Sequence, residues 1–280
     1  MNRIDGRGGS REHRPMSSQT PRTCLVLIPG LLCDANVWRS QIAALSGLAD
    51  VRVSDHGTQH SLADMARTII DSAPARFAVA GHSMGGRIAL EVFHAAPDRV
   101  TGLALLDTGI HPLAPGEPGE LETAGRYRLL EIARREGMRA MAREWVQGMV
   151  HASRLGERRL IDPILDMFES KSSSIYAAQI RALLQRNDAA PLLSRIRVPT
   201  LLLCGHEDTW SPPERHLEMR GRIQGSTFVD IPVCGHMSTM ERPDAVNAAM
   251  RTWLESVIAA ESGALARGSR TSSSATGARS

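Results

Sequence analysis

The amino-acid sequence predicts an α/β fold: a mostly parallel, doubly wound sheet of about six strands with an inserted helical cap. Short apolar runs alternate along the chain with helical patterns, an order typical of βαβ units with right-handed crossovers. Between two of the strands, roughly eighty residues show only helical spacing, which is too long for an ordinary crossover. No apolar run approaches the roughly 18 residues needed to span a membrane, so we expect a water-soluble fold.

Six short runs are predicted to be strands. Each is mostly apolar and ends at Gly, Pro or Asp, as is typical of strands buried on both faces of a parallel sheet. The predicted strands are residues 24–29, 51–55, 76–80, 100–106, 200–204 and 227–231. Apolar residues spaced three and four apart predict helices between them. These helices are residues 37–48, 61–72, 84–95, 213–221 and 244–260.

The helical interval divides the predicted sheet into two parts. Residues 23–112 and 195–261 are expected to form the core, and residues 113–194 a separate helical cap over the carboxyl edge of the sheet, where active sites of such folds lie. A helical addition with no role in binding is the alternative. The four patterns within the cap are residues 121–135, 138–150, 160–168 and 174–185.

The charge of the chain is concentrated at its ends. It has 280 residues, with 33 Lys and Arg against 30 Asp and Glu, a formal net charge of +3. Residues 1–22 hold five arginines and two acidic residues, and residues 262–280 hold three arginines and no acidic residue, which leaves residues 23–261 at −3. A mildly acidic middle argues against a nucleic-acid-binding core. Both ends are poor in apolar residues, and we expect them to be disordered tails.

Several classes of site have no signal in the sequence. The four cysteines show neither metal-ligand spacing nor the density of a disulfide scaffold, so reduced thiols and a cytoplasmic location are predicted. There is no phosphate-binding loop or dinucleotide fingerprint, and we therefore predict no cofactor and no metal. Lys171, the only lysine, lies among serines and is expected to be solvated. The oligomeric state and the choice between Met1 and Met16 as the start cannot be decided from the sequence.

A serine stands in a sharp turn after the third predicted strand. The chain there reads Gly81-His82-Ser83-Met84-Gly85-Gly86 and then turns helical. Glycines two positions on either side of a serine let a strand turn directly into a helix, where a Cβ atom would clash. Ser83 would thereby lie at a helix N-terminus, a place that favours developing negative charge. Ser83 is therefore the candidate nucleophile.

A serine nucleophile needs a base, and the base needs an orienting acid. His236 follows the last predicted strand, on the same sheet edge as Ser83, and is the candidate base. Asp208 follows the preceding strand and is the favoured acid. Glu207 and Asp107 are the alternatives for that role. Other histidines have ordinary structural roles in this interpretation: His82 is expected to pack under the turn, and His206 and His216 to lie at the surface.

The order Ser83, Asp208, His236 resembles that of the α/β-hydrolase superfamily. The run 81–86 looks like its nucleophile elbow, 205–212 like its acid loop and 234–243 like its histidine loop, and the resemblance covers about residues 24–260. It implies the α/β-hydrolase fold and three catalytic residues in these loops. The superfamily normally has two further strands before the first one predicted here, so the usual antiparallel edge is expected to be missing.

The resemblance also implies an oxyanion hole. Relatives usually carry His-Gly after an early strand, where this chain has Pro29-Gly30. By that likeness the backbone amides of Leu31 and Met84 would bind the oxyanion, and the missing histidine leaves open what fixes the loop. Trp38 and Trp210, on the neighbouring loops, are candidates to line a substrate pocket, although either could be a packing anchor.

These features together predict a cofactor-free serine hydrolase, a carboxylesterase-like enzyme acting on a small ester, lactone or thioester. Carbon–carbon bond hydrolysis or hydroxynitrile-lyase-like cleavage on the same scaffold is the alternative, and a non-catalytic ligand-binding protein is a further one. The expected partner is a small-molecule ester-like substrate, with no nucleic acid and no membrane. Residues 109–191 hold twelve basic and eleven acidic residues, a balance that predicts no preference for anionic substrates.

Overall fold

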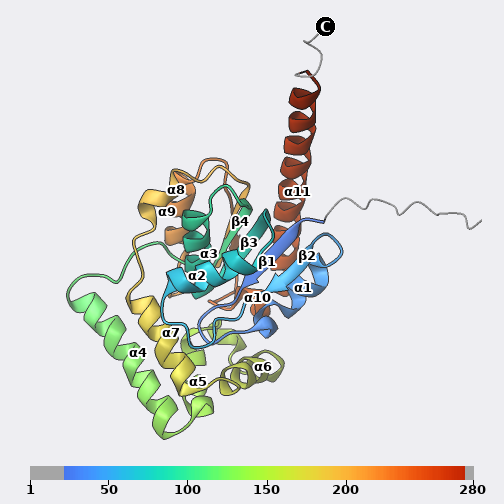
Figure 1. Ribbon diagram of the computed structural model, residues 1–280. Coiled ribbons are helices and arrows are strands. Elements are labelled where there is room, and N and C mark those ends of the chain that lie inside the picture. The colour runs from blue at the N-terminus through green and yellow to red at the C-terminus, as the bar shows by residue number, and fades with distance from the viewer. Residues whose placement is uncertain (1–21, 275–280) are drawn as a thin grey trace, which may run out of the picture.

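The computed structural model describes residues 22–274, with side chains to residue 264. Six parallel strands form one sheet in the order β2-β1-β3-β4-β5-β6 (Figure 1). The predicted fold class and all six predicted strands are confirmed. The strands are β1 (Cys24–Ile28), β2 (Asp50–Val53), β3 (Phe77–His82), β4 (Val100–Leu106), β5 (Thr200–Gly205) and β6 (Thr227–Ile231).

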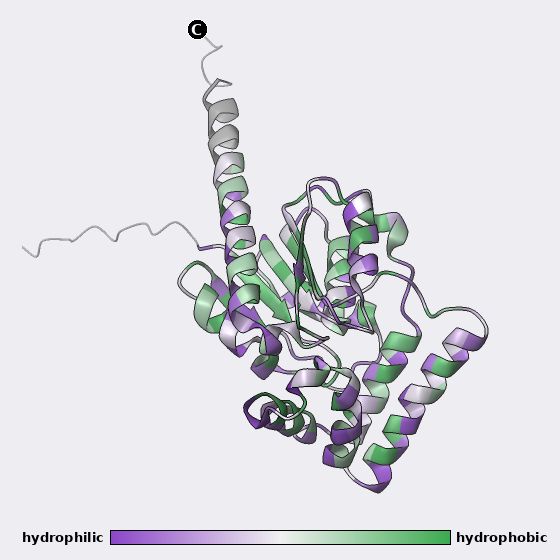
Figure 2. Ribbon diagram, turned by 180° about the vertical axis from the view of Figure 1, so that it is seen from behind, coloured by the Kyte–Doolittle hydropathy of each residue, from purple (hydrophilic) through white to green (hydrophobic). Residues whose placement is uncertain are grey.

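The four central strands form the core of the sheet. Every residue of β1, β3, β4 and β5 is buried, whereas the edge strands β2 and β6 have exposed and half-buried residues, with Ile231 of β6 buried. Figure 2 shows the central strands as mostly hydrophobic. The apolar runs are therefore buried strands, as the sequence predicts, because a parallel strand covered by helices on both faces has no face exposed to solvent.

Helices cover both faces of the sheet (Figures 1 and 2). On one face α3 packs against β1, β3, β4 and α2, and α9 packs against β5 and β6; on the other, α11 packs against β4, β5 and α1. Right-handed crossovers produce this arrangement. The bounds are α1 (Arg39–Leu45), α2 (Leu62–Ser72), α3 (Met84–Ala95), α9 (Pro213–Arg222) and α11 (Pro243–Ser274), with a 3-10 turn η1 (Ala35–Trp38) before α1.

The segment between β4 and β5 contains helices only, and we call it the helical insert. An aromatic cluster packs its interior: the Trp145 ring lies 5.2 Å from Phe168 and 5.7 Å from Tyr176. Its division from the core at residues 113 and 195 stays a prediction. The elements are α4 (Glu117–Arg135), α5 (Met138–Trp145), η2 (Val146–Gly148), η3 (Ala152–Arg154), α6 (Arg158–Glu169), α7 (Ser173–Leu184) and α8 (Ala190–Leu193).

The ends of the chain differ from expectation where they are described. The prediction of a disordered tail from residue 262 was wrong as far as residue 274, because α11 continues to Ser274. Residues 1–21 and 275–280 lie outside the described part. Two short helices were not expected: α8, which opens on Ala-Pro, and α10 (Ser238–Glu241). Within residues 22–274, no helix is both long and apolar enough to cross a membrane.

The start of α3 lies directly against the end of β1, which makes a glycine necessary there. A Cβ atom on Gly85 would lie 2.1 Å from the carbonyl oxygen of Ile28, and both atoms belong to rigid backbone. We predict that Gly85→Ala lowers the free energy of unfolding by ~3 kcal/mol, since overpacked backbone must shift. Urea denaturation followed by circular dichroism measures this change.

Gly221, inside α9, is the matched control. Nothing lies within 4 Å of the position of its Cβ atom. Gly221→Ala should raise the free energy of unfolding by about 0.5–1 kcal/mol, because alanine loses less backbone entropy than glycine in a helix. Equal effects of the two substitutions would show that the contact between α3 and β1 is not as close as described.

Candidate active site

Ser83 occupies a strained turn between β3 and α3. Its φ of 54° and ψ of −117° lie in a region that non-glycine residues seldom adopt. A Cβ atom on Gly81 would lie 2.1 Å from the carbonyl oxygen of Gly85, so the turn requires glycine. The Ser83 N–H donates to the Leu106 carbonyl at 2.8 Å, and the Thr108 hydroxyl donates to the Ser83 carbonyl at 2.7 Å. The surrounding structure thus holds the strained conformation.

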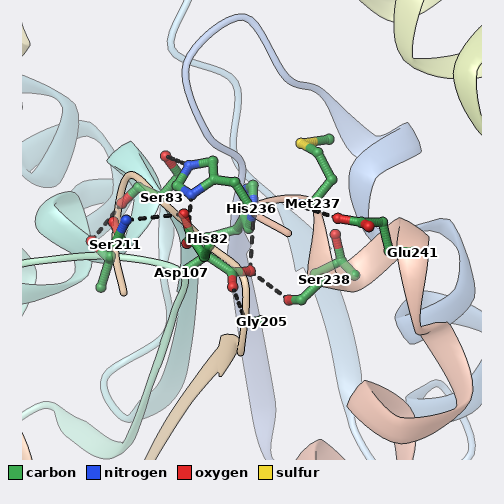
Figure 3. A network of polar contacts seen from close by, with 12 residues as sticks. His82, Ser83, Asp107, Gly205, Ser211, His236, Met237, Ser238 and Glu241 are labelled. Carbon is green, nitrogen blue, oxygen red and sulfur yellow. Dashed lines mark hydrogen bonds and ion pairs between the residues drawn. The ribbon is translucent and has the colours of Figure 1, made fainter. Parts of the chain in front are cut away.

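The three candidate residues meet at the carboxyl edge of the sheet, and Figure 3 shows the Ser83 and His236 side chains next to each other. His236 Nε2 lies 2.7 Å from Ser83 Oγ, and His236 Nδ1 lies 2.7 Å from Asp208 Oδ2. Asp208 follows β5 and His236 follows β6, so neighbouring strands bring them together. The structure therefore forms the chain of contacts that the sequence predicted for these residues.

Asp208 is buried and remains ionised. Burial alone would raise its pKa, but the charge of His236, their hydrogen bond and two backbone amides lower the pKa overall. Those amides are the N–H groups of Trp210 and Ser211, which both donate to Asp208 Oδ1 at 2.9 Å. An ionised, fixed carboxylate can hold the His236 ring in one orientation with Nδ1 protonated.

The two alternative acids contact other groups. Asp107 accepts hydrogen bonds from the Gly205 N–H, at 3.0 Å, and from the Ser238 hydroxyl (Figure 3). Its carboxyl is fully buried, and burial together with the charge of Asp208 raises its pKa. Glu207 accepts a hydrogen bond from the Cys234 N–H at 2.9 Å. Both side chains therefore hold the loops around His236, and neither hydrogen-bonds to its ring.

The neighbouring histidines are structural. His82 is buried under the turn and donates from Nε2 to the His236 carbonyl at 2.8 Å; burial, with the nearby His236 ring adding, lowers its pKa to about 3. His206 is exposed at the surface as predicted. The prediction for His216 was wrong. Its ring is buried and accepts a hydrogen bond from the Thr108 N–H at 3.3 Å, because helix α9 turns it toward the end of β4.

The loop after β1 carries the residues predicted for the oxyanion hole. Leu31 and Met84 both line the cavity that contains Ser83. Met84 is in the first turn of α3, where amides have no partner within the helix. Leu32, at a φ of 61°, donates its N–H to Gln179 Oε1 at 2.8 Å. A glutamine of the helical insert therefore holds this loop. The resemblance to the superfamily implies a histidine in that role, at the position where this chain has Pro29.

A second contact joins the same loop to the insert. Lys171 Nζ lies 2.9 Å from Asp34 Oδ2, and its side chain is only 20% exposed. The prediction of a solvated lysine was therefore wrong: the serines around it lie at the start of α7, which brings the ammonium group to the loop. Nothing in the sequence predicts the contacts of Gln179 and Lys171 with this loop, which lies about 140 residues earlier in the chain.

The cavity beside Ser83 has a volume of about 480 Å³, within the range of small-molecule sites. Trp210 lines it, and its ring lies 4.8 Å from that of His236. Trp38 does not line it; the side chain is fully buried with its ring 6.3 Å from His82, so it is a packing anchor. Cys33 also lines the cavity, but burial raises the pKa of its thiol to about 12.

Glu241 is a site residue that the sequence did not indicate. Its buried carboxylate accepts hydrogen bonds from the N–H groups of His151, Gly235 and Met237, at 2.9, 3.0 and 3.3 Å. The His236 N–H donates to the Met149 carbonyl at 2.7 Å. The histidine loop is therefore fastened to the helical insert. Among the described residues, no cluster of His, Cys, Asp and Glu could hold a metal ion.

Comparison with known proteins agrees with this geometry. The sequence profile of the alpha/beta hydrolase family matches residues 25–249. The chain belongs to the alpha/beta hydrolase family. Ser83, Asp208 and His236 all lie within the matched range.

Several relatives of this alpha/beta hydrolase span most of its length. A 2-succinyl-6-hydroxy-2,4-cyclohexadiene-1-carboxylate synthase from Serratia proteamaculans is 27% identical over 84% of this chain and 94% of its own. A thermophilic esterase from Thermogutta terrifontis is 28% identical, with a TM-score of 0.74 over 85% of this chain and 91% of that one. An enol-lactonase from Burkholderia xenovorans, 24% identical, shares the fold with a TM-score of 0.73 over 84% and 92%. The chain thus shares its fold with both solved structures over most of its length.

We predict that Gln179→Leu lowers both stability and turnover. The substitution keeps the volume but leaves the buried Leu32 N–H without a partner, which should lower the free energy of unfolding by about 1–3 kcal/mol. A looser oxyanion loop should lower kcat for ester hydrolysis by about ten-fold. Gln185→Leu, an exposed glutamine just past the end of α7, is the control. A kcat that falls equally in both variants, or in neither, would contradict the role of Gln179.

Proposed function

We propose that this alpha/beta hydrolase is a serine hydrolase that cleaves a small carboxylic ester, lactone or thioester through an acyl-enzyme. The observation that carries the proposal is the unbroken chain of hydrogen bonds from Asp208 through His236 to Ser83, at a cavity of small-molecule size. The likeness to an esterase and an enol-lactonase of known structure supports it.

In the acylation step, Ser83 Oγ attacks the carbonyl carbon of the substrate. His236 Nε2, 2.7 Å away, takes the proton of the hydroxyl. Asp208 fixes the ring and stabilises its charged form. The amides of Leu31 and Met84 bind the oxyanion as the carbonyl becomes tetrahedral, and Met84 does so from the N-terminus of a helix. His236 then donates its proton to the departing alcohol or thiol.

In the deacylation step, a water molecule attacks the acyl-enzyme. His236 takes a proton from the water and returns one to Ser83 as the acid leaves. The lowered pKa of Asp208 keeps its carboxylate ionised through both steps. The position of Trp210 against the His236 ring excludes bulk water from one side of the imidazole.

The nucleophile can be tested with a fluorophosphonate probe and p-nitrophenyl butyrate. The protein should be labelled at Ser83 and should hydrolyse the ester, and Ser83→Ala should abolish labelling and lower kcat by about 1,000-fold or more. Ser194→Ala, an exposed serine after α8, is the control. Undiminished hydrolysis in Ser83→Ala would overturn the proposal. Labelling with no hydrolysis of any simple ester would instead favour carbon–carbon bond or cyanohydrin cleavage.

The assignment of the acid makes a separate prediction. Asp208→Asn should lower kcat by ~10³–10⁴-fold, because a neutral amide no longer holds the imidazole in the required tautomer. Glu207→Gln, one residue earlier, should lower it by less than about ten-fold, since that side chain only contacts the Cys234 amide. A larger loss of kcat for Glu207→Gln than for Asp208→Asn would show that the assignment of Asp208 as the acid is wrong.

A further inference from the structure

The cavity beside Ser83 is lined by an unusual number of arginines. They come from helices far apart in the chain, whereas only two acidic residues, Asp107 and Glu122, line the same cavity. Asp107 lies fully buried beneath Ser83 with a raised pKa, so it adds little negative charge at the surface of the cavity. The arginines are Arg87 of α3, Arg126 and Arg128 of α4, Arg186 after α7 and Arg215 of α9.

Three of these arginines have acidic partners. Arg126 and Arg186 share Glu122, each with a contact of 2.8 Å or shorter, and Arg128 pairs with Glu144. The two guanidinium groups lower the pKa of Glu122 to about 2 even though burial opposes this, so its carboxylate is ionised. One negative charge thus offsets only one of the two positive charges that share it.

The other two arginines, Arg87 and Arg215, converge on one point. A Cβ atom on Gly109 would lie 3.3 Å from Arg215 Nη1 and 3.4 Å from Arg87 Nη2, so both guanidinium groups flank this glycine. Arg87 also donates from Nη1 to the His111 carbonyl at 2.8 Å, and Arg186 donates to the same oxygen at 3.2 Å. Three guanidinium groups therefore lie side by side.

Arg87 and Arg215 have no carboxylate within ion-pair distance among residues 22–264. Burial lowers the pKa of Arg87 to about 9, and the positive charges of Arg186 and Arg215 act in the same direction. Arg87 is half-buried and Arg215 is exposed, so both guanidinium groups stay charged at neutral pH where they line the cavity. The cavity therefore has a positive potential that an anion would relieve.

We propose that this arginine cluster, centred on Arg87 and Arg215, binds a carboxylate group of the substrate remote from the bond that Ser83 attacks. The proposal rests on the function proposed above and names its substrate class: a monoester or monothioester of a dicarboxylic acid, or a lactone acid. Guanidinium groups bind carboxylates through paired hydrogen bonds, and Nη2 of Arg87 and Nη1 of Arg215 both lie beside Gly109 in the lining of the cavity.

The position of Arg87 limits the distance between the reacting carbonyl and the carboxylate group of the substrate. Ser83 directly precedes α3 and Arg87 is the fourth residue of that helix, so about one helical turn, roughly 6 Å of rise, separates the two Cα atoms. A substrate with its reacting carbonyl at Ser83 and its carboxylate at the cluster would have a short aliphatic chain between them. Adipate, with four methylenes between its carboxyl groups, is a suitable acid for a probe.

The test compares mono(p-nitrophenyl) adipate with its neutral methyl ester, using Ser83→Ala to subtract spontaneous hydrolysis. The ratio of kcat/KM for the charged ester over the neutral one should exceed about ten in the wild type. Arg87→Gln and Arg215→Gln should each lower this ratio by about ten-fold, mainly through KM. Arg215 is exposed, so its substitution keeps the fold. Arg220→Gln, on an exposed position of the same helix α9, is the matched control.

Two outcomes would overturn the inference. One is a wild-type ratio at or below one, and the other is an equal fall of the ratio in Arg220→Gln and Arg215→Gln, which would show a general charge effect. Either result, obtained with a protein that a fluorophosphonate labels at Ser83 and that hydrolyses the neutral ester, leaves the serine hydrolase intact. Failure of labelling and of all ester hydrolysis would instead remove the proposed function itself.

Discussion

The site depends on one constraint, the close approach of the first turn of α3 to the end of β1. Gly85 lies against the Ile28 and Pro29 carbonyls with no room for a side chain, and Ser83 is held between this contact and its hydrogen bond to Leu106. The backbone at Ser83 is strained, and strain of this kind persists only where the surroundings over-determine it. Three neighbouring strands, β1, β3 and β4, supply those surroundings, so the sheet itself determines the direction of the nucleophile.

The other half of the site is held by buried acids. Asp107, Glu207 and Glu241 each accept backbone hydrogen bonds at the carboxyl edge of the sheet, and these bonds hold the segments around His236 in place. Glu241 and the Met149 carbonyl also tie the histidine loop to the helical insert. A shift of the insert would therefore change the position of His236 as well as the shape of the cavity.

The sequence predicted the parts of this structure that local rules determine. Buried strands, the glycine turn and the order of loops depend on neighbouring residues, and all three are present. Long-range contacts could not be predicted in this way. Gln179 meets Leu32 only because α7 comes back to the loop after β1, and His216 turns inward only because α9 packs on β5 and β6. The extension of α11 to residue 274 runs through a stretch of serines and glycines, residues whose helix propensity is below that of alanine, and local rules therefore did not predict it.

The arginines show how composition can mislead when residues converge in space. Basic and acidic residues are nearly equal in number in the insert, yet its arginines meet those of α3 and α9 at one wall of one cavity. A purely structural cluster would be expected to hold an acid beside Arg87, as Glu122 lies beside Arg126 and Arg186. Arg87 and Arg215 have no such acid among the described residues, so a carboxylate-bearing substrate would supply the negative charge that this wall of the cavity lacks.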